Sequence, residues 1–292
     1  MLQTEITPEA KAIVDNAIAD VGEIATLPEV TVKIIEIVEN PKSTARDLHD
    51  VIKNDPALSA RILKVVNSAF YGLPGQISSI DRAIVLLGLS AVKNIAIAAS
   101  MTHLFTGGNN IEGFSGADVW KHSIAIGVGS RLLSAAQGRP QVEESFLAGL
   151  ISDLGLLVER QVFSQELAEV VSRYRGEGRS FCELEQEVIG ADHQAFGMAL
   201  AKKWRFPQTL CTTIGYHHNP TALAEVNREL PAIINVADIL ASRSEIGFCQ
   251  HLTNAEISDD LYTLIKLDPA KVAEIEAEIP EQTSIAESIF GD

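Results

Sequence analysis

The segment NDPALSARILKVVNSAFYG, at residues 54–72, sets the pattern that the rest of the chain follows. Asp55 precedes Pro56, an N-cap followed by proline at the first helical position, which is where proline favours the start of a helix. The apolar residues that follow recur at helical spacing and predict one buried face: Leu58, Ile62, Val65, Val66 and Ala69. The turn formers of YGLPG at 71–75 then predict the end of this helix.

Helical periodicity continues on both sides of this segment. Upstream, Thr26 and Glu29 predict a capping box, followed by an apolar stripe that includes Val30 and Ile34. Downstream, Ser78 or Ser79 predicts the start of the next helix, and Ser115 with Asp118 predicts the cap of the helix that holds His122. Further helices are predicted near 143–160, 163–175, 181–189, 192–204, 207–217, 230–243 and 268–279.

The sequence predicts an all-α fold, because strand-like alternation never lasts for more than a few residues. The clearest cluster of helix breakers is GGNN at 107–110. It divides the chain into two predicted helical lobes, 1–110 and 111–292. The tail after Asn254 carries 10 acidic and 2 basic residues, and its helix is expected to be mostly solvated.

Composition narrows the class of protein and its partners. The 292 residues carry a formal net charge of −16, which disfavours binding to nucleic acid or to anionic lipid. The most apolar segment, 83–99, is too short and too polar to span a bilayer, and no signal peptide is apparent. Three cysteines without C-x-x-C spacing fit reduced thiols. We therefore expect a cytoplasmic protein of undetermined oligomeric state.

The second half of the chain holds a dispersed set of histidines and carboxylates. Asp153 lies inside the apolar stretch AGLISDLGLLV, where a buried carboxylate needs a partner. The other members are His122, His193, His217, His218 and Asp238. Their nitrogen and oxygen atoms suit Zn, Fe, Mn, Co or Ni better than Ca or Mg. The long spacing is weak support by itself, since no compact signature such as H-E-x-x-H is present.

Each histidine also has an interpretation without a metal. His122 lies among apolar residues and could be a hydrogen-bonded core histidine. His217 and His218 end a predicted helix, where an imidazole interacts favourably with the helix dipole. Adjacent helical residues diverge by about 100°. Both rings can therefore reach one centre only if that centre lies over the end of the helix.

Several motifs resemble the HDOD (HD-related output domain) family, a branch of the HD phosphohydrolase superfamily. In the first half they are LPEV at 27–30, NDPALSARILKVVNSAFYG at 54–72, ISSIDRAIVLLG at 77–88 and VKN at 92–94. In the second half they are AGLISDLGLL at 148–157, DHQAFGMALAKKW at 192–204 and HHNP at 217–220. The resemblance covers roughly residues 20–245.

The resemblance implies a smaller helical lobe followed by an HD-like helical bundle. Catalytic relatives with the HD-GYP motif hold two metals over one shared aspartate, which Asp153 matches. His193, His217 and His218 match the histidines of one metal site. His122 and Asp238 match parts of the other site. Ser152 stands where those relatives have a histidine, and a hydroxyl is a much poorer metal ligand than an imidazole.

Two further departures bear on activity. Leu156 follows Gly155 where the catalytic relatives have a lysine, and Asn219-Pro220 replaces their Gly-Tyr-Pro continuation. A hydrolase of this kind uses a second metal to generate hydroxide and to clamp the reacting oxygens. The losses therefore favour a non-catalytic signalling module that acts through a protein partner. We expect it to bind at most one divalent transition metal tightly (Fe, Mn, Zn or Ni).

Two alternatives stay open at this point. A water held by Ser152 could replace the lost ligand, which would leave a metal-dependent phosphohydrolase. A bound metal could instead serve a redox or oxygen sensor. No other catalytic pattern is present in the sequence, such as G-x-S-x-G, a P-loop or a cysteine beside a histidine.

Overall fold

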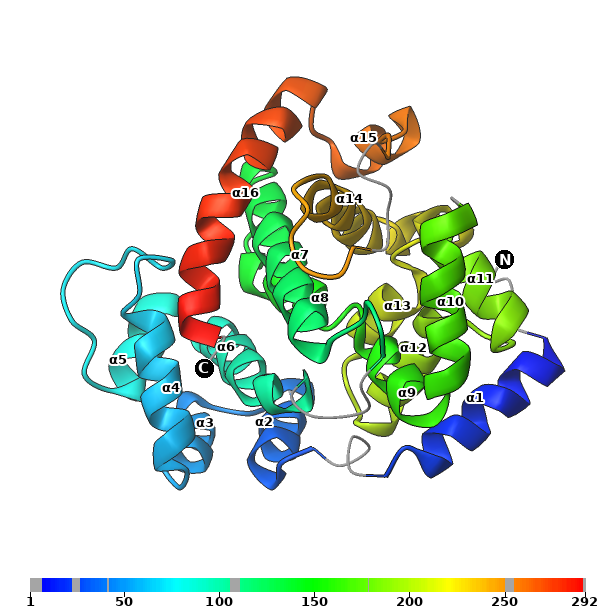
Figure 1. The fold of residues 1–292 in the computed structure, drawn as a ribbon. Helices are drawn as coiled ribbons and strands as arrows, with labels where there is room; N and C mark the ends of the chain where they lie inside the picture. Colours follow the sequence, from blue (N-terminus) through cyan, green and yellow to red (C-terminus); the bar gives the residue numbers. More distant parts are fainter. Residues whose placement is uncertain are drawn as a thin grey trace.

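The structure is a computed structural model of the chain, and it describes residues 7–22, 27–40, 42–105, 111–177, 179–249 and 255–290. These residues form α-helices joined by short turns and 3₁₀ segments (Figure 1). In the described ranges the only β-type pairing is an isolated bridge between Ile111 and Phe114. The predicted all-α fold is confirmed. No described helix is both long and apolar enough to cross a membrane.

The first half of the chain contributes six α-helices and one 3₁₀ turn: α1 (Pro8–Asp20), α2 (Glu29–Glu39), α3 (Ala45–Ile52), α4 (Pro56–Val66), α5 (Ile80–Leu87), α6 (Leu89–Met101) and η2 (Thr102–Phe105). Two predicted caps are present. The side chain of Asp55 accepts the Leu58 N–H at 2.9 Å, and Ser79 accepts the Arg82 N–H at 3.2 Å. These side chains satisfy amide groups that the first turn of a helix leaves unpaired.

Two details of this half differ from the prediction. Helix α2 begins at Glu29, and its N-cap is Pro28, which makes no side-chain cap; Thr26, the predicted partner in a capping box, lies outside the described residues. Helix α4 ends at Val66, and its buried face consists of Leu58, Ile62, Val65 and Val66. Ala69, which was expected on that face, is exposed because the chain has already turned away from the helical path.

The second half contributes the remaining elements: α7 (Gly116–Ala136), α8 (Val142–Leu150), α9 (Leu154–Val162), α10 (Ser164–Glu177), α11 (Phe181–Val188), α12 (His193–Lys203), α13 (Gln208–Tyr216), η3 (Pro220–Ala222), η4 (Glu225–Asn227), α14 (Glu229–Arg243), α15 (Asp259–Ile265) and α16 (Pro269–Phe290). The predicted cap of α7 is present, since Ser115 accepts the Asp118 N–H at 3.0 Å. The single helix predicted near 143–160 is instead two helices, broken at residues 151–153.

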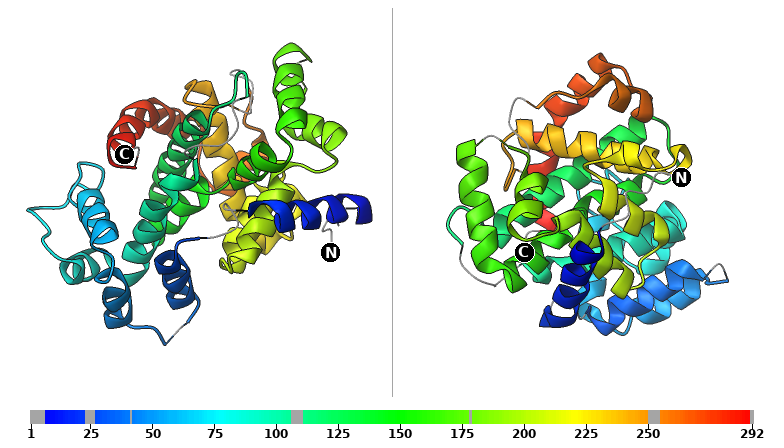
Figure 2. Two further views of the ribbon diagram at one scale, coloured as in Figure 1. Left: turned by 60° about the horizontal axis from the view of Figure 1, so that its bottom comes forward. Right: turned by 90° about the vertical axis from the view of Figure 1, so that its right-hand side faces the viewer.

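Helix α7 is the centre of the bundle and packs against α8, α14 and α16 (Figures 1 and 2). Glycines let α7 and α8 approach closely: a Cβ atom on Gly149 would lie 2.9 Å from the Cα atom of Gly127. Helix α1 packs against α9 and α12 in the second half of the chain. The boundary at 107–110 lies outside the described residues, and the division into lobes 1–110 and 111–292 stays a prediction.

The C-terminal helix α16 is longer and less solvated than the sequence suggested. It continues through Pro280 to Phe290, and its buried side chains include Val272, Ile275 and Ile279. Its last described carbonyl, that of Phe290, accepts hydrogen bonds from the Trp120 indole at 3.0 Å and the Thr102 hydroxyl at 3.1 Å. The acidic residues cover one side of α16, while an apolar stripe on the other side packs against α7.

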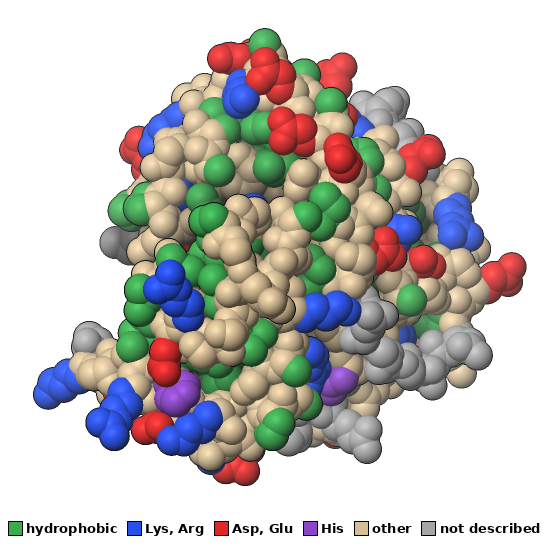
Figure 3. Space-filling view, turned by 90° about the vertical axis from the view of Figure 1, so that its left-hand side faces the viewer, with side chains coloured by type: hydrophobic (Ala, Val, Ile, Leu, Met, Phe, Trp, Pro, Cys, Tyr) green, Lys and Arg blue, Asp and Glu red, His purple; other side chains and the backbone are tan. Residues whose placement is uncertain are grey.

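Charge is distributed unevenly over the fold. Residues 42–105 carry 7 basic and 4 acidic side chains, whereas residues 255–290 carry 2 basic and 9 acidic ones. On the face shown in Figure 3, Lys and Arg side chains lie mainly in the lower part, over the early helices, and Asp and Glu gather towards the top, at the α16 end. The net negative charge is therefore concentrated away from α3–α6.

The aromatic end of the 54–72 motif joins the early helices to α7 and α8. The Tyr71 hydroxyl donates to one carboxylate oxygen of Glu143 at 2.5 Å, and Arg131 Nε donates to the other at 3.0 Å. The Arg131 guanidinium also lies 4.5 Å from the ring centroid of Phe70. Burial, and then the charge of Glu143, raise the pKa of Tyr71 well above its usual value, so the phenol remains a donor.

We expect Tyr71→Phe to lower the free energy of unfolding by about 1–3 kcal/mol, because a buried carboxylate loses a donor. Urea unfolding followed by circular dichroism measures this change. The matched control is Tyr262→Phe, since the Tyr262 hydroxyl has no hydrogen bond to the described part of the chain. Equal stability of the two variants would contradict this account of the Tyr71 contact.

Candidate metal centre

A break between α8 and α9 places Asp153 in the interior. Asp153 is the N-cap of α9 and is 1% exposed, yet neither of its carboxylate oxygens has a hydrogen bond. Gly155, two residues on, permits close packing with α12, because a Cβ atom there would lie 1.8 Å from the His193 carbonyl oxygen. The absence of a side chain at this position therefore allows the start of α12, with His193, to lie next to Asp153.

Three imidazoles surround this carboxylate, and two of them are held in orientation by a contact to the Nδ1 atom. His193 Nδ1 lies 2.8 Å from a carboxylate oxygen of Glu185, and His217 Nδ1 lies 2.8 Å from the Ile214 carbonyl oxygen. A ring nitrogen held by a carboxylate or a carbonyl acts as the donor and leaves the opposite nitrogen as a lone pair. This is the usual outer support of a metal-binding histidine.

The free edges of the rings converge on Asp153. His217 Nε2 and His193 Nε2 lie 3.5 and 3.9 Å from Asp153 Oδ1. His218 Nε2 lies 3.0 Å from His193 Nε2. One candidate ligand atom from each of Asp153, His193, His217 and His218 falls within 4.8 Å of the others. Both His217 and His218 reach the group because α13 ends at Tyr216, so the cluster lies over the helix terminus.

The residues present fit a divalent transition metal. Three imidazole nitrogens and one carboxylate oxygen form a donor set suited to Zn, Fe, Mn or Ni. A cation would also satisfy the two Asp153 oxygens, which lack hydrogen bonds, and the His217 Nε2 atom, which lacks one as well. Burial alone would raise the pKa of Asp153, but the facing imidazoles of His217 and His193 together lower that pKa.

His122 and Asp238, which the resemblance assigned to a second metal site, are hydrogen-bonded to each other. His122 Nε2 lies 2.9 Å from Asp238 Oδ1, and His122 Nδ1 lies 2.8 Å from the Ile246 carbonyl oxygen. Both ring nitrogens are thus engaged within the core. Burial alone would lower the pKa of His122, but Asp238 outweighs it and holds the pKa well above its usual value.

Ser152 faces away from this region. Its hydroxyl donates to the Gly149 carbonyl at 2.9 Å, which completes the end of α8. Asp238 still lies beside the four-residue group, with Oδ2 3.6 Å from His218 Nδ1. The structure therefore brings four of the six predicted residues into one group. It leaves His122 and Asp238 as a hydrogen-bonded pair behind it.

Three residues that support the site were missed by sequence analysis. Glu185 orients His193, and the Gln194 side-chain oxygen accepts the His218 N–H at 3.0 Å. Glu159 is fully buried beside Glu185; burial, and then the charge of Glu185, raise its pKa well above the usual value. A glutamate following the apolar run LGLLV was the one available signal. Nothing local in the sequence marked Glu185 or Gln194.

Comparisons with solved structures agree with this fold. An HDOD domain protein of unknown function from Geobacter sulfurreducens superposes with a TM-score of 0.80, at 24% identity, over 97% of this chain and 98% of the other. A protein from Shewanella amazonensis SB2B, described as a candidate phosphohydrolase, superposes with a TM-score of 0.72, at 24% identity, over 94% and 98%. At this level of identity the likeness concerns the fold.

Sequence relatives match only part of longer proteins. An uncharacterized protein of Treponema pallidum (strain Nichols) is 24% identical over 239 residues, which are 82% of this chain but 45% of the relative. The uncharacterized protein YuxH of Bacillus subtilis (strain 168) is 31% identical over 113 residues, which are 39% and 27% of the two chains. The chain thus spans less than half the length of these relatives.

The sequence profile of the HDOD domain matches residues 24–220. This range begins before α2 and ends just after His217 and His218, so it includes three helices that carry the metal-site residues. The match extends over more than half of the chain, which belongs to the HDOD domain family.

Proposed function

We propose that this chain is a non-catalytic regulatory module that holds one divalent transition metal and acts through contact with a signalling protein. The observation that carries this proposal is the contrast between two groups of buried residues. Ligand atoms of Asp153 and three imidazoles converge, and the two Asp153 oxygens and His217 Nε2 lack hydrogen bonds, whereas His122 is hydrogen-bonded to Asp238 and Ser152 turns away. The group around Asp153 supplies four ligand atoms for one metal, which is the basis of the one-metal proposal.

The burial of the four residues also argues against hydrolysis. The side chains of His193, His217 and Asp153 are 0, 0 and 1% exposed, and that of His218 is 11% exposed. A phosphoester would have to displace protein atoms to reach them. When bound, a divalent metal supplies Lewis acidity, but a two-metal hydrolase also needs a second ion to hold the leaving oxygen.

A metal-dependent phosphohydrolase is the second candidate. Its support is that one complete set of nitrogen and oxygen donors is retained in a fold shared with candidate phosphohydrolases. In this case His193, His217, His218 and Asp153 would hold the metal. The candidates differ in an observable result, since only this one requires turnover that depends on Asp153.

Elemental analysis of protein purified without chelator should give about one equivalent of transition metal per chain. Asp153→Asn should lose most of it, because the carboxylate is the only anionic ligand of the group. His122→Gln should retain it, because His122 is bonded to Asp238 and the Ile246 carbonyl. Circular dichroism checks that both variants are folded. Two equivalents in the unchanged protein would contradict the one-metal proposal.

We expect no hydrolysis of phosphomonoesters, nucleotides or cyclic dinucleotides with added Mn²⁺ or Fe²⁺ above the level of the Asp153→Ala variant. The physical reason is the buried position of the site. Liberated phosphate and nucleotide products measured by chromatography test this. Turnover that disappears in Asp153→Ala would establish the phosphohydrolase instead.

Glu185→Gln should weaken metal binding by about 10-fold or more, because His193 loses the carboxyl group that orients its ring. Competition with a chromophoric chelator for Zn²⁺ measures the affinity. Glu187→Gln is the matched control on the same helix, since Glu187 is exposed and pairs with Arg173 and Arg179. Unchanged affinity in Glu185→Gln would remove Glu185 from the support of the site.

A further inference from the structure

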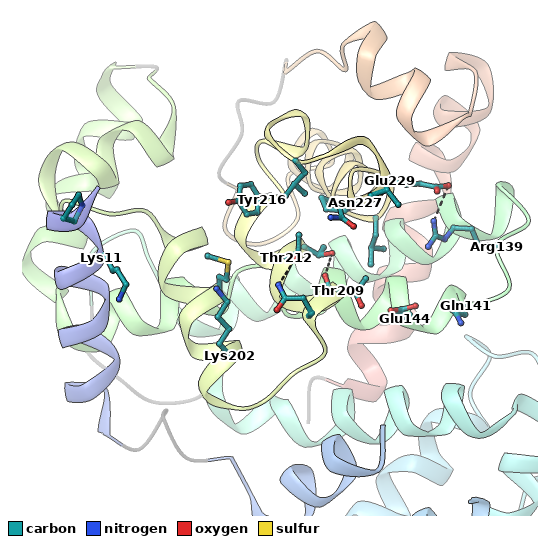
Figure 4. A pocket seen from close by; sticks show the side chains of 18 residues that line it. Lys11, Arg139, Gln141, Glu144, Lys202, Thr209, Thr212, Tyr216, Asn227 and Glu229 are labelled. Atoms are coloured by element: carbon teal, nitrogen blue, oxygen red, sulfur yellow. Dashed lines mark hydrogen bonds and ion pairs between the residues drawn. The ribbon is translucent and has the colours of Figure 1, made fainter. Parts of the chain in front are cut away.

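A cleft of about 1130 Å³ runs along the outer faces of α12 and α13 (Figure 4). Helix α1 forms one side and contributes Lys11, while η4 and the start of α14 form the other and contribute Asn227 and Glu229. The volume exceeds the roughly 300–1,000 Å³ of ordinary small-molecule pockets. Its size and open shape suit a segment of chain.

The floor of the cleft presents hydrogen-bonding groups to an occupant. Thr209, Thr212 and Tyr216 line it from successive turns of α13 (Figure 4). Within the described residues the Tyr216 hydroxyl has no hydrogen bond, and Thr212 accepts one from the Gln208 amide at 3.1 Å. Hydroxyl and amide groups at this spacing can donate to, and accept from, the backbone of an extended peptide.

The charge of the cleft is opposite to that of the chain. At the end formed by α1 and α12, Lys202 has no acidic partner among the described residues, and Lys11 pairs only with exposed Asp15. At the other end Arg139 and Glu229 neutralise each other at 3.3 Å. Glu144 is the remaining acid, and burial raises its pKa. A cationic end in a chain of net charge −16 favours an acidic occupant.

One exposed apolar residue lies on the rim. Val226 of η4 lines the cleft and is 88% exposed. Among the described residues, it is the most exposed of the three large apolar side chains that lie mainly on the surface. On the floor, Met198 supplies a flexible thioether that can adapt to different side chains. An occupant would therefore meet apolar contacts as well as charge.

We propose that this cleft is the docking site for an extended acidic peptide segment of the partner protein. Its carboxylates would pair with Lys11 and Lys202, and its backbone would bond to the α13 side chains. The proposal rests on the function proposed above and names the surface through which that function is exerted.

The cleft shares two helices with the candidate metal centre. Helix α12 begins at His193 and lines the cleft through Met198 and Lys202. Helix α13 lines it through Tyr216, the residue next to His217. A peptide in the cleft would thus contact α12, which begins with His193, and α13, which ends directly before His217 and His218. Metal and peptide should change each other's affinity by the same factor.

Methionine methyl signals give a direct test, because Met198 lies in the cleft and Met101 is fully buried in α6. The protein is labelled with [¹³C-methyl]methionine and titrated with three ten-residue probes of equal Ser, Thr and Val content that carry three Glu, three Gln or three Lys. Met198→Leu assigns the signal. The Glu probe should shift the Met198 signal and leave the Met101 signal in place, with at least 5-fold higher affinity than the Gln probe.

The Lys11→Glu, Lys202→Glu double variant should lose this response at least 10-fold. The control Lys53→Glu, Lys271→Glu has the same net charge and should retain it, because both lysines lie outside the cleft. Three results would overturn the proposal: an equal response in the two variants, no preference for the Glu probe, or a shift of the Met198 signal with inorganic phosphate but with none of the peptides. Because no turnover is measured, a negative result here leaves the proposed non-catalytic function to its own assays.

Discussion

The buried carboxylate of Asp153 is the constraint on which the arrangement of the second half depends. A charged group without hydrogen bonds is costly in the interior unless cations or donors face it. Here the chain leaves the helical path between α8 and α9 so that Asp153 faces three imidazoles from α12 and the end of α13. Gly155 permits the contact with α12 that this convergence requires, since a side chain there would overlap the His193 carbonyl. The same break is therefore both a packing feature and the position of the site.

The hydrogen bonds of Ser152, His122 and Asp238 bear on whether this chain could hold a second metal. Ser152 caps the end of α8, and His122 forms a buried pair with Asp238. These contacts engage the Ser152 hydroxyl, both ring nitrogens of His122 and one carboxylate oxygen of Asp238. By contrast, both carboxylate oxygens of Asp153 and the Nε2 atom of His217 lack hydrogen bonds. In this chain Ser152 and His122 are thus held by local hydrogen bonds, while the four candidate ligands around Asp153 lie together.

The early helices are physically connected to this region. Tyr71 and Arg131 meet at Glu143, near the start of α8, and α8 ends immediately before Ser152 and Asp153. On another side, α12 and α13 connect the histidines to a cleft with a cationic end. Two surfaces of the molecule therefore contact elements that carry the candidate ligands. Through these shared elements, binding at a surface can be linked to the occupancy of a buried site.

The sequence alone determined the helical class, the caps at Asp55 and Ser115, a cap at Ser78 or Ser79, and the residue types of the site, because helix periodicity and capping are local properties. It also suggested too long a helix near 143–160 and too solvated an α16. Only the tertiary structure decided that His193, His217 and His218 share one centre with Asp153 while His122 turns to Asp238. Partners separated by up to 116 residues are selected by helix packing, which local spacing does not encode. Glu185 and Gln194 were missed for the same reason, since their role exists only once α11, α12 and α13 are packed together.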